Sequence, residues 1–182
     1  MRIFGIDPGS ERTGYGCIDS DGSRCQLVAR GVISLPSSLR FPDKLVRVFD
    51  ELVAQLARHR PACVAVEGVF YARNARSALI LGQVRGVVLL AAGKAALPVS
   101  EYAATAVKSA VVGYGRADKR QVQHMVSLLL GLDELPSPHD VSDALAIAIC
   151  HAHTGALEST RDLASSGAEL RSWRRYRTSG DQ

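Results

Sequence analysis

Carboxylates stand at the ends of three apolar segments that are far apart in the sequence. Asp7 follows the short apolar run at residues 3–6, and Glu67 follows the run at residues 62–66. Asp140 and Asp143 precede a further apolar stretch and are three residues apart, so on a helix they would share one face. If the fold brings these acids together, they form a cluster of hard oxygen ligands.

Four clustered carboxylates need cations, because their negative charges repel one another. Oxygen ligands with few histidines nearby favour Mg²⁺ or Mn²⁺ over zinc. Two such ions about 3.5–4 Å apart hydrolyse phosphodiesters in many enzymes, where one prepares the attacking water and the other stabilises the leaving oxygen. The pattern therefore predicts a metal-dependent nuclease that needs no covalent nucleophile.

Each acid also has an ordinary structural interpretation. Asp7 begins an Asp-Pro-Gly turn, and Glu67 would be a simple strand-end acid. Asp140 and Asp143 resemble a capping pair at the start of a helix, where negative charge complements the helix dipole. Each of these explanations is the better one when its acid is taken alone. The shared placement of all four at one edge of one sheet favours the metal site.

His139 is an ambiguous neighbour of this set. It lies directly before Asp140 and four residues before Asp143. It could bind a metal, shuttle a proton or donate a hydrogen bond to a ligand, or it could face solvent ahead of the helix. The sequence leaves these roles open and slightly favours the last.

The segments that carry the acids predict an α/β domain. Three antiparallel strands are expected first, the second and third joined by an Asp-Gly hairpin turn, then alternating helices and strands. This order gives a five-stranded mixed sheet, antiparallel on one side and parallel through helical crossovers on the other. Strands are predicted over 2–7, 13–18, 26–33, 62–66 and 97–102, and helices over 41–59, 75–96, 103–112, from 118 onward, and over 139–150.

Composition limits the class of protein. The 182 residues are 47% hydrophobic and 22% charged, with a net charge of +4, as expected for one soluble globular domain that tolerates a polyanionic partner. The four cysteines are widely spaced and form no zinc motif, which is typical of free thiols in a reducing compartment. With no signal peptide and no uninterrupted apolar run of membrane-spanning length, we expect a cytoplasmic protein without a membrane partner.

Basic and aromatic side chains beside the acids are candidates for DNA binding. Phe70, Tyr71 and Arg73 follow Glu67 closely, and the aromatic rings could stack on unpaired bases, with core packing as the alternative for one of them. Further basic residues are usually only a solvated face, but beside a metal site phosphate contacts are the better interpretation. This basic series includes Lys108, Arg116, Lys119 and Arg120.

Four long segments of residues 2–153 carry a specific resemblance to a known family. The segments are GIDPGSERTGYG, VAVEGVFYARNARSALILGQVRGV, EYAATAVKSAVVGYGRADKRQVQHM and DVSDALAIAI. They resemble the RuvC family of bacterial Holliday junction resolvases. The resemblance implies a ribonuclease H-like fold and a homodimer that places one active site on each of two like-polarity strands of a four-way junction. Paired symmetric nicks would leave 5′-phosphate ends that a ligase can seal during recombination and repair.

The resemblance also implies a role for individual positions. The family's metal-binding catalytic acids fall on Asp7, Glu67, Asp140 and Asp143, with His139 as a further ligand candidate. Two Mg²⁺ ions per site are implied, with Mn²⁺ able to substitute. The aromatic residue that wedges the junction falls on Phe70, and two functional lysines fall on Lys108 and Lys119. The helix predicted over 75–96 resembles the dimer-forming region, and the branch-migration proteins RuvA and RuvB are implied partners.

Residues 1–155 are expected to form the ribonuclease H-like nuclease domain, and 156–182 a basic tail. The tail alternates arginines with aromatics over 171–177, and a flexible solvated end is favoured there over contact with DNA, RuvA or RuvB. One alternative function is a relative of the actin and Hsp70 ATPases, which would need a second domain for which the chain has no room. Another is a non-catalytic junction-binding module, against which the presence of all four acids argues.

Overall fold

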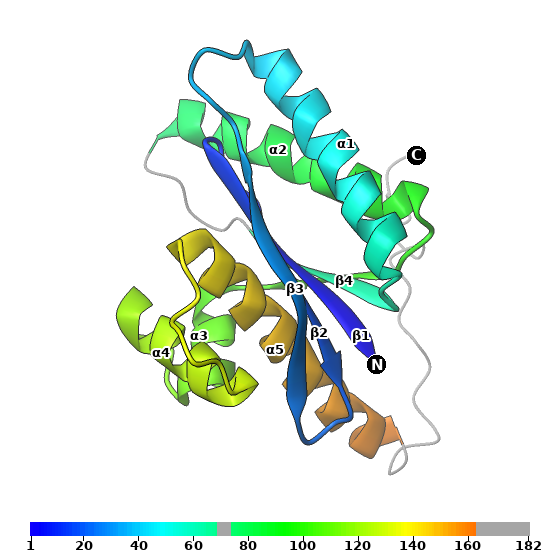
Figure 1. The fold of residues 1–182 in the computed structure, drawn as a ribbon, viewed down its shortest axis with the longest axis vertical. Helices are drawn as coiled ribbons and strands as arrows, with labels where there is room; N and C mark the ends of the chain where they lie inside the picture. The colour runs from blue at the N-terminus through cyan, green and yellow to red at the C-terminus, as the bar shows by residue number, and fades with distance from the viewer. Residues whose placement is uncertain (69–73, 163–182) are drawn as a thin grey trace, which may run out of the picture.

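The computed structural model describes residues 1–68 and 74–162 of the chain. A central sheet has helices on both of its faces (Figure 1). Its five strands lie in the order β3-β2-β1-β4-β5. They are β1 (Arg2–Asp7), β2 (Arg12–Ser20), β3 (Cys25–Ser34), β4 (Cys63–Glu67) and β5 (Val99–Tyr102). The prediction of a five-stranded mixed sheet is confirmed.

Strand β1 is the centre of the sheet and sets the position of the acids. It pairs antiparallel with β2 and parallel with β4, and β4 pairs parallel with β5. The register places Ile6 opposite Val66, so Asp7 and Glu67 leave neighbouring strands at the same end. On the other side, Asp7 is opposite Gly14 of β2.

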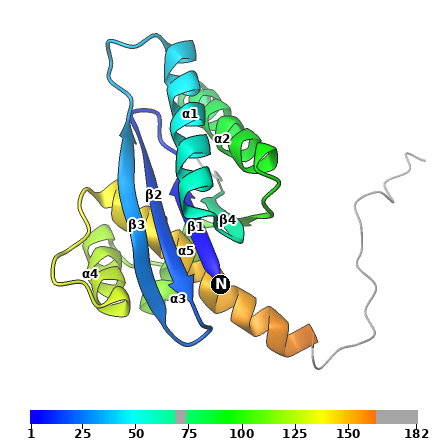
Figure 2. The ribbon, with the colours of Figure 1, turned by 45° about the vertical axis from the view of Figure 1, so that its right-hand side comes forward.

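Two helices cover one face of the sheet, α1 (Phe41–His59) and α2 (Ala75–Lys94) (Figure 2). The bounds of α1 are those predicted from its amphipathic pattern. Its buried side chains Val48, Leu52 and Leu56 belong to the same core cluster as Phe4 and Ile6 of β1. This cluster anchors the acid-bearing strand from one side.

Three helices cover the other face, α3 (Ala104–Val112), α4 (Lys119–Leu130) and α5 (His139–Asp162). The apolar part of α5 packs against β1 and β2, and Leu145 and Ile149 lie in a core cluster with Ile3 and Ile18. The prediction ended α5 at residue 150, but the helix continues to Asp162. Figure 2 shows that the end of the helix projects beyond the sheet. The domain boundary expected at residue 155 therefore lies inside α5.

Helix α5 approaches the sheet backbone closely because glycines face it. A Cβ atom added at Gly5 would collide with the carbonyl oxygen of Ala144, and one at Gly14 would collide with that of Asp140. At Gly16 an added Cβ would lie 2.5 Å from the Leu145 side chain. Since Gly14 is opposite Asp7 in the sheet, the same contact that seats the helix brings Asp140 beside Asp7.

A hydrogen-bonded chain ties α5 to the parallel side of the sheet. His151 Nε2 lies 3.2 Å from Cys63 Sγ of β4, and His151 Nδ1 lies 2.8 Å from the Tyr102 hydroxyl of β5. The ring edge of Tyr102 also contacts the His151 ring, with the two planes 72° apart. These contacts hold α5 against β4 and β5 beyond the turns that carry the acids.

We expect Gly14→Ala to lower the free energy of unfolding by about 1–3 kcal/mol, because the new methyl group pushes the first turn of α5 away from β2. Urea unfolding followed by circular dichroism would measure this change. Gly93→Ala is the matched control: an added Cβ there meets nothing within 4 Å, and alanine in a helix is favoured over glycine by about 0.5–1 kcal/mol. Wild-type stability in Gly14→Ala would contradict the close contact.

Candidate active site

Four acids from three elements meet at one edge of the sheet. Asp7 ends β1, Glu67 ends β4, and Asp140 and Asp143 lie on the first turns of α5. The surroundings of Asp7 show that the acids are close together: burial raises its pKa well above the usual range, and the charges of Glu67, Asp143 and Asp140 raise it further. The structure therefore brings together the four acids that the sequence analysis singled out.

Asp7 and Glu67 form a half-buried carboxyl pair. Burial is the main cause that raises the pKa of Glu67, and the side-chain hydrogen bond with Asp7 acts in the opposite direction. Burial is also the main cause that raises the pKa of Asp7, and the charge of Glu67 raises it further. Each carboxyl group disfavours the ionised form of the other, because like charges at close range repel.

Basic side chains compensate the acids of α5. Lys119 Nζ donates to Asp143 Oδ2 at 3.0 Å, and this hydrogen bond is the main cause that raises the pKa of Lys119. Arg12 Nη1 lies 3.9 Å from Asp140 Oδ2. Among the described residues, both carboxylates therefore face basic side chains and not the backbone N–H groups that helix caps would bind.

The chemistry of the donor set fits a hard divalent cation. Among residues 1–68 and 74–162, no three side chains of Asp, Glu, His or Cys already surround a single point as ligands. Asp143 lies against Lys119, and Asp140 lies near Arg12. The acids nevertheless offer only carboxylate oxygens, and their charges raise the pKa of Asp7 beyond the effect of burial. Mg²⁺ or Mn²⁺ fits such a set, and zinc does not.

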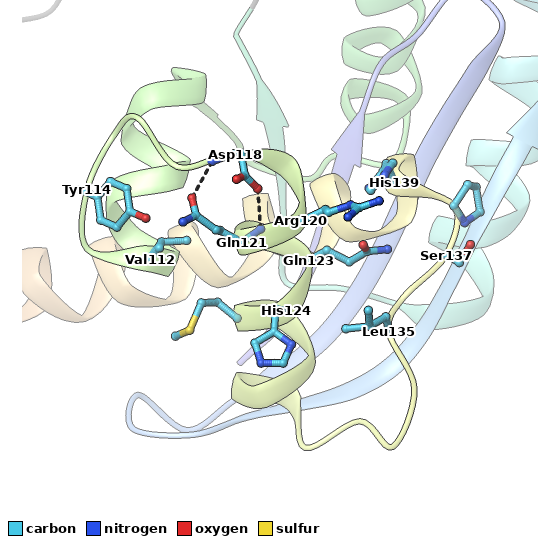
Figure 3. Close-up of a pocket in the computed structure, with 12 residues that line it drawn as sticks. Val112, Tyr114, Asp118, Arg120, Gln121, Gln123, His124, Leu135, Ser137 and His139 are labelled. Carbon is cyan, nitrogen blue, oxygen red and sulfur yellow. Dashed lines mark hydrogen bonds between the residues drawn. The ribbon is translucent and has the colours of Figure 1, made fainter.

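His139 is exposed and lies at the edge of the site. It lines a hollow of about 930 Å³ over α4, together with Arg120, Gln123 and His124 (Figure 3). This position agrees with the solvent-facing interpretation from the sequence.

The predicted DNA-binding residues fall into two groups. Phe70, Tyr71 and Arg73 lie outside the described residues. The second group surrounds the start of α4: Lys108 is on α3, Arg116 is on the connection to α4, and Lys119 and Arg120 begin α4. The charges of Lys119 and Lys108 both lower the pKa of Glu67, which places these two lysines near the acids.

The start of α4 is held rigidly. Asp118 Oδ1 accepts a hydrogen bond from the Gln121 backbone N–H at 2.9 Å, and Gln121 Oε1 accepts one from the Asp118 backbone N–H at 2.9 Å (Figure 3). This reciprocal capping box satisfies the open end of the helix. Lys119 and Arg120 therefore project from a fixed base.

Arg12 is a residue near the acids that sequence reasoning missed. It stands at the start of β2, exposed, beyond a tight turn in which Gly9 faces the Arg12 backbone closely. The available signal was the antiparallel pairing of the first two strands. Their register returns the chain to the edge that Asp7 occupies, which places the residues just before Gly14 beside the acids.

The chain matches known proteins over most of its length. Residues 3–151 match the family model described as "Crossover junction endodeoxyribonuclease RuvC". A protein of that name from Koribacter versatilis is 53% identical over 157 residues, covering 86% of this chain and 95% of the relative. One from Syntrophomonas wolfei is 48% identical over 159 residues, covering 87% and 92%.

Solved structures agree with these matches. The structure of Thermus thermophilus RuvC in complex with Holliday junction substrate has a TM-score of 0.83 and 36% identity, and the likeness covers 87% of this chain and 97% of that one. The yeast mitochondrial resolvase Ydc2 has a TM-score of 0.63 at 16% identity, covering 88% and 82%, which shows a shared fold only. The expected ribonuclease H-like fold is thereby confirmed.

We expect Asp7→Asn to stabilise the metal-free protein at pH 8 by about 1–3 kcal/mol, because it removes a buried charge surrounded by three acids. The folded pKa of Asp7 is raised above its unfolded value of about 4, so the wild type loses stability as the pH rises from about 4 toward the folded pKa, and the variant lacks this loss. Below about pH 4 the two proteins should unfold alike. Thermal melts in EDTA across this range would measure the difference. A variant that is less stable than the wild type at pH 8 would contradict the crowding of the acids.

Proposed function

Because the chain belongs to the RuvC family of crossover junction endodeoxyribonucleases, we propose that it hydrolyses the junction strand with two divalent ions. Asp7, Glu67, Asp140 and Asp143 would hold these ions. Membership in the family makes the chain a Holliday junction resolvase that acts in recombination and repair. The observation that carries this proposal is geometric: Asp7 and Glu67 end neighbouring parallel strands at the same edge, and the contact of Gly14 with Asp140 brings the start of α5 to that edge. Family membership removes the basis for the ATPase and the non-catalytic alternatives.

The four acids have different tasks in this proposal. Asp7 and Glu67 are fixed by adjacent parallel strands, so their oxygens form the rigid part of the site. Asp140 and Asp143 complete the set from α5, which the sheet glycines hold in place. Mg²⁺, with Mn²⁺ able to substitute, would activate the attacking water and stabilise the leaving oxygen. Lys119, which donates to Asp143 in this structure, would contact the phosphate backbone if metal ions took over the compensation of that carboxylate.

The basic and aromatic residues around the acids bind DNA in this proposal. Lys108 and Lys119 approach the phosphates next to the cut, and Arg116 and Arg120 extend the same positive surface along α4. Phe70 is the wedge that opens the junction, with Tyr71 and Arg73 beside it. These assignments come from the resemblance in sequence and from the position of the lysines next to Glu67.

We further propose that α2 forms a homodimer interface. An 18-residue window of α2 has a mean hydropathy of 1.4, yet only 22% of it is buried. Leu79 and Leu90 are 67% and 60% exposed, and Gly82 and Gly86 have open space where a side chain would be. Length and composition alone would also suit a membrane span, but Arg85 of α2 is ion-paired with Glu101 of β5, which holds the helix on the sheet.

The remaining proposals concern the setting of the reaction. Four free cysteines suit a reducing cytoplasm, where we place the protein. We keep RuvA and RuvB as partners from the family resemblance, and residues 1–155 as the nuclease domain with 156–182 as a basic tail.

We expect Asp7→Asn to abolish nicking of a synthetic four-way junction in Mg²⁺ while junction binding stays within about twofold of the wild type. A single lost ligand of a two-metal site removes the activated water but leaves the DNA contacts in place. Gel assays of 5′-labelled strands would follow nicking, and anisotropy would follow binding. Mg²⁺ should raise the melting temperature of the wild type and leave that of the variant nearly unchanged. Wild-type cutting rates in the variant would contradict the metal assignment.

We expect Leu79→Glu and Leu90→Glu to weaken dimer formation roughly a hundredfold or more, because each buries an unpaired charge against a second copy of α2. Sedimentation velocity at micromolar concentration would show the monomer. Val46→Glu is the matched control, since Val46 is 59% exposed but lies on α1. Dimers of unchanged stability in both α2 variants would contradict this interface.

A further inference from the structure

A polar hollow lies at the acid-bearing edge of the sheet, where β2 begins, β3 ends and α1 begins. Its volume is about 420 Å³, and its polar lining comes from Glu11, Arg12, Ser34, Ser37 and Lys44. Helix α1 covers the opposite face of the sheet from α4 (Figure 2). The hollow therefore flanks the acids on the side away from the basic surface of α4.

Arg12 belongs to both the hollow and the acid cluster. Its Nη1 atom lies 3.9 Å from Asp140 Oδ2, and its side chain is 57% exposed. An ion pair at that distance and exposure is weak, so little holds the guanidinium in this one position. The guanidinium can therefore turn toward an anion in the hollow that it lines.

The rest of the lining also suits an anion. In the part of the chain that the structure describes, Lys44 makes no ion pair, and the neighbouring Asp43 is engaged with Arg40 at 2.8 Å. Glu11 is the one acid among the lining residues, and it makes no ion pair with the two basic residues. Two cations against one carboxylate leave the hollow positive.

Hydroxyl groups complete the set of donors. Ser34 and Ser37 are both exposed and line the same hollow as Arg12 and Lys44. Guanidinium, ammonium and hydroxyl donors around a small polar volume are the contacts that proteins use for phosphate groups. The apolar lining is limited to Leu35 and Pro36, which offers little to a base or an apolar peptide.

We propose that this hollow binds a backbone phosphate of the strand being cut, next to the scissile phosphate. The inference rests on the proposed cleavage site, because the acids determine which strand passes this edge. The strand would be held on both sides of the cut, by the lysines around α4 on one side and by Arg12 and Lys44 on the other. Arg12 and Lys44 are then positioning residues that align the phosphodiester with the acids.

Binding of a synthetic four-way junction to the full-length protein tests whether Arg12 and Lys44 contact the DNA. Measured by anisotropy in Mg²⁺, in an Asp7→Asn background that prevents cutting, Lys44→Ala and Arg12→Ala should each weaken binding roughly tenfold. Each should also lower the slope of log K against log salt by about 1. Arg24→Ala is the control, because it removes the same charge from the exposed hairpin at the opposite end of the sheet. Variants of Lys44 and Arg12 that match this control would overturn the proposal.

Neutral methylphosphonates placed one at a time around the cut test where the phosphate lies. One position should weaken wild-type binding roughly tenfold and have no further effect in Lys44→Ala, as a double-mutant cycle requires. If the loss of binding from the methylphosphonate and the loss from Lys44→Ala add at every position tested, the proposal is overturned. A second result would also overturn it: inorganic phosphate raises the melting temperature of the wild type but not of Lys44→Ala, while both proteins bind the junction equally well. The hollow would then be an anion site that takes no part in junction binding. Nicking of the unmodified junction by the wild type reports separately on the proposed function.

Discussion

Helix α5 rests directly on the backbone of β1 and β2, because glycine stands at positions 5, 14 and 16 of the sheet. Any side chain at Gly14 would collide with the backbone of Asp140, the first acid of the helix. Gly14 is in turn opposite Asp7 in the hairpin register. One steric contact therefore determines both the packing of the buried helix and the distance between the acids of two different elements. The hydrogen bonds of His151 with Cys63 and Tyr102 hold the same helix further along.

This rigid frame gathers charges that would otherwise separate. Burial and the nearby acids raise the pKa of Asp7, and burial also raises the pKa of Glu67. Lys119 and Arg12 offset the charge of the two acids on α5. The same two basic side chains are the ones proposed to contact phosphate groups on either side of the acids, so the proposed metal site and the proposed DNA contacts share residues.

Much of this could be predicted from local patterns. The alternation and burial of short apolar runs were enough to predict the five strands, and the spacing of apolar residues predicted α1 with its bounds. The acids were recognisable because each stood at the end of an apolar run. Local patterns failed at the end of α5, which projects beyond the sheet (Figure 2). They also failed at Arg12 and Lys44, which in sequence are ordinary exposed basic residues near a turn and a helix start.

The sequence by itself determined the types of the reacting groups, their place at strand and helix ends, and the family to which the chain belongs, because these depend on residue identity and on short-range periodicity. Only the tertiary structure decided which charges meet. The pairing of Asp7 with Glu67, the contact of Lys119 with Asp143 and the approach of Arg12 to Asp140 depend on strand register and on helix seating. Those are set by backbone contacts between distant segments, such as that of Gly14 with Asp140, which no local pattern encodes.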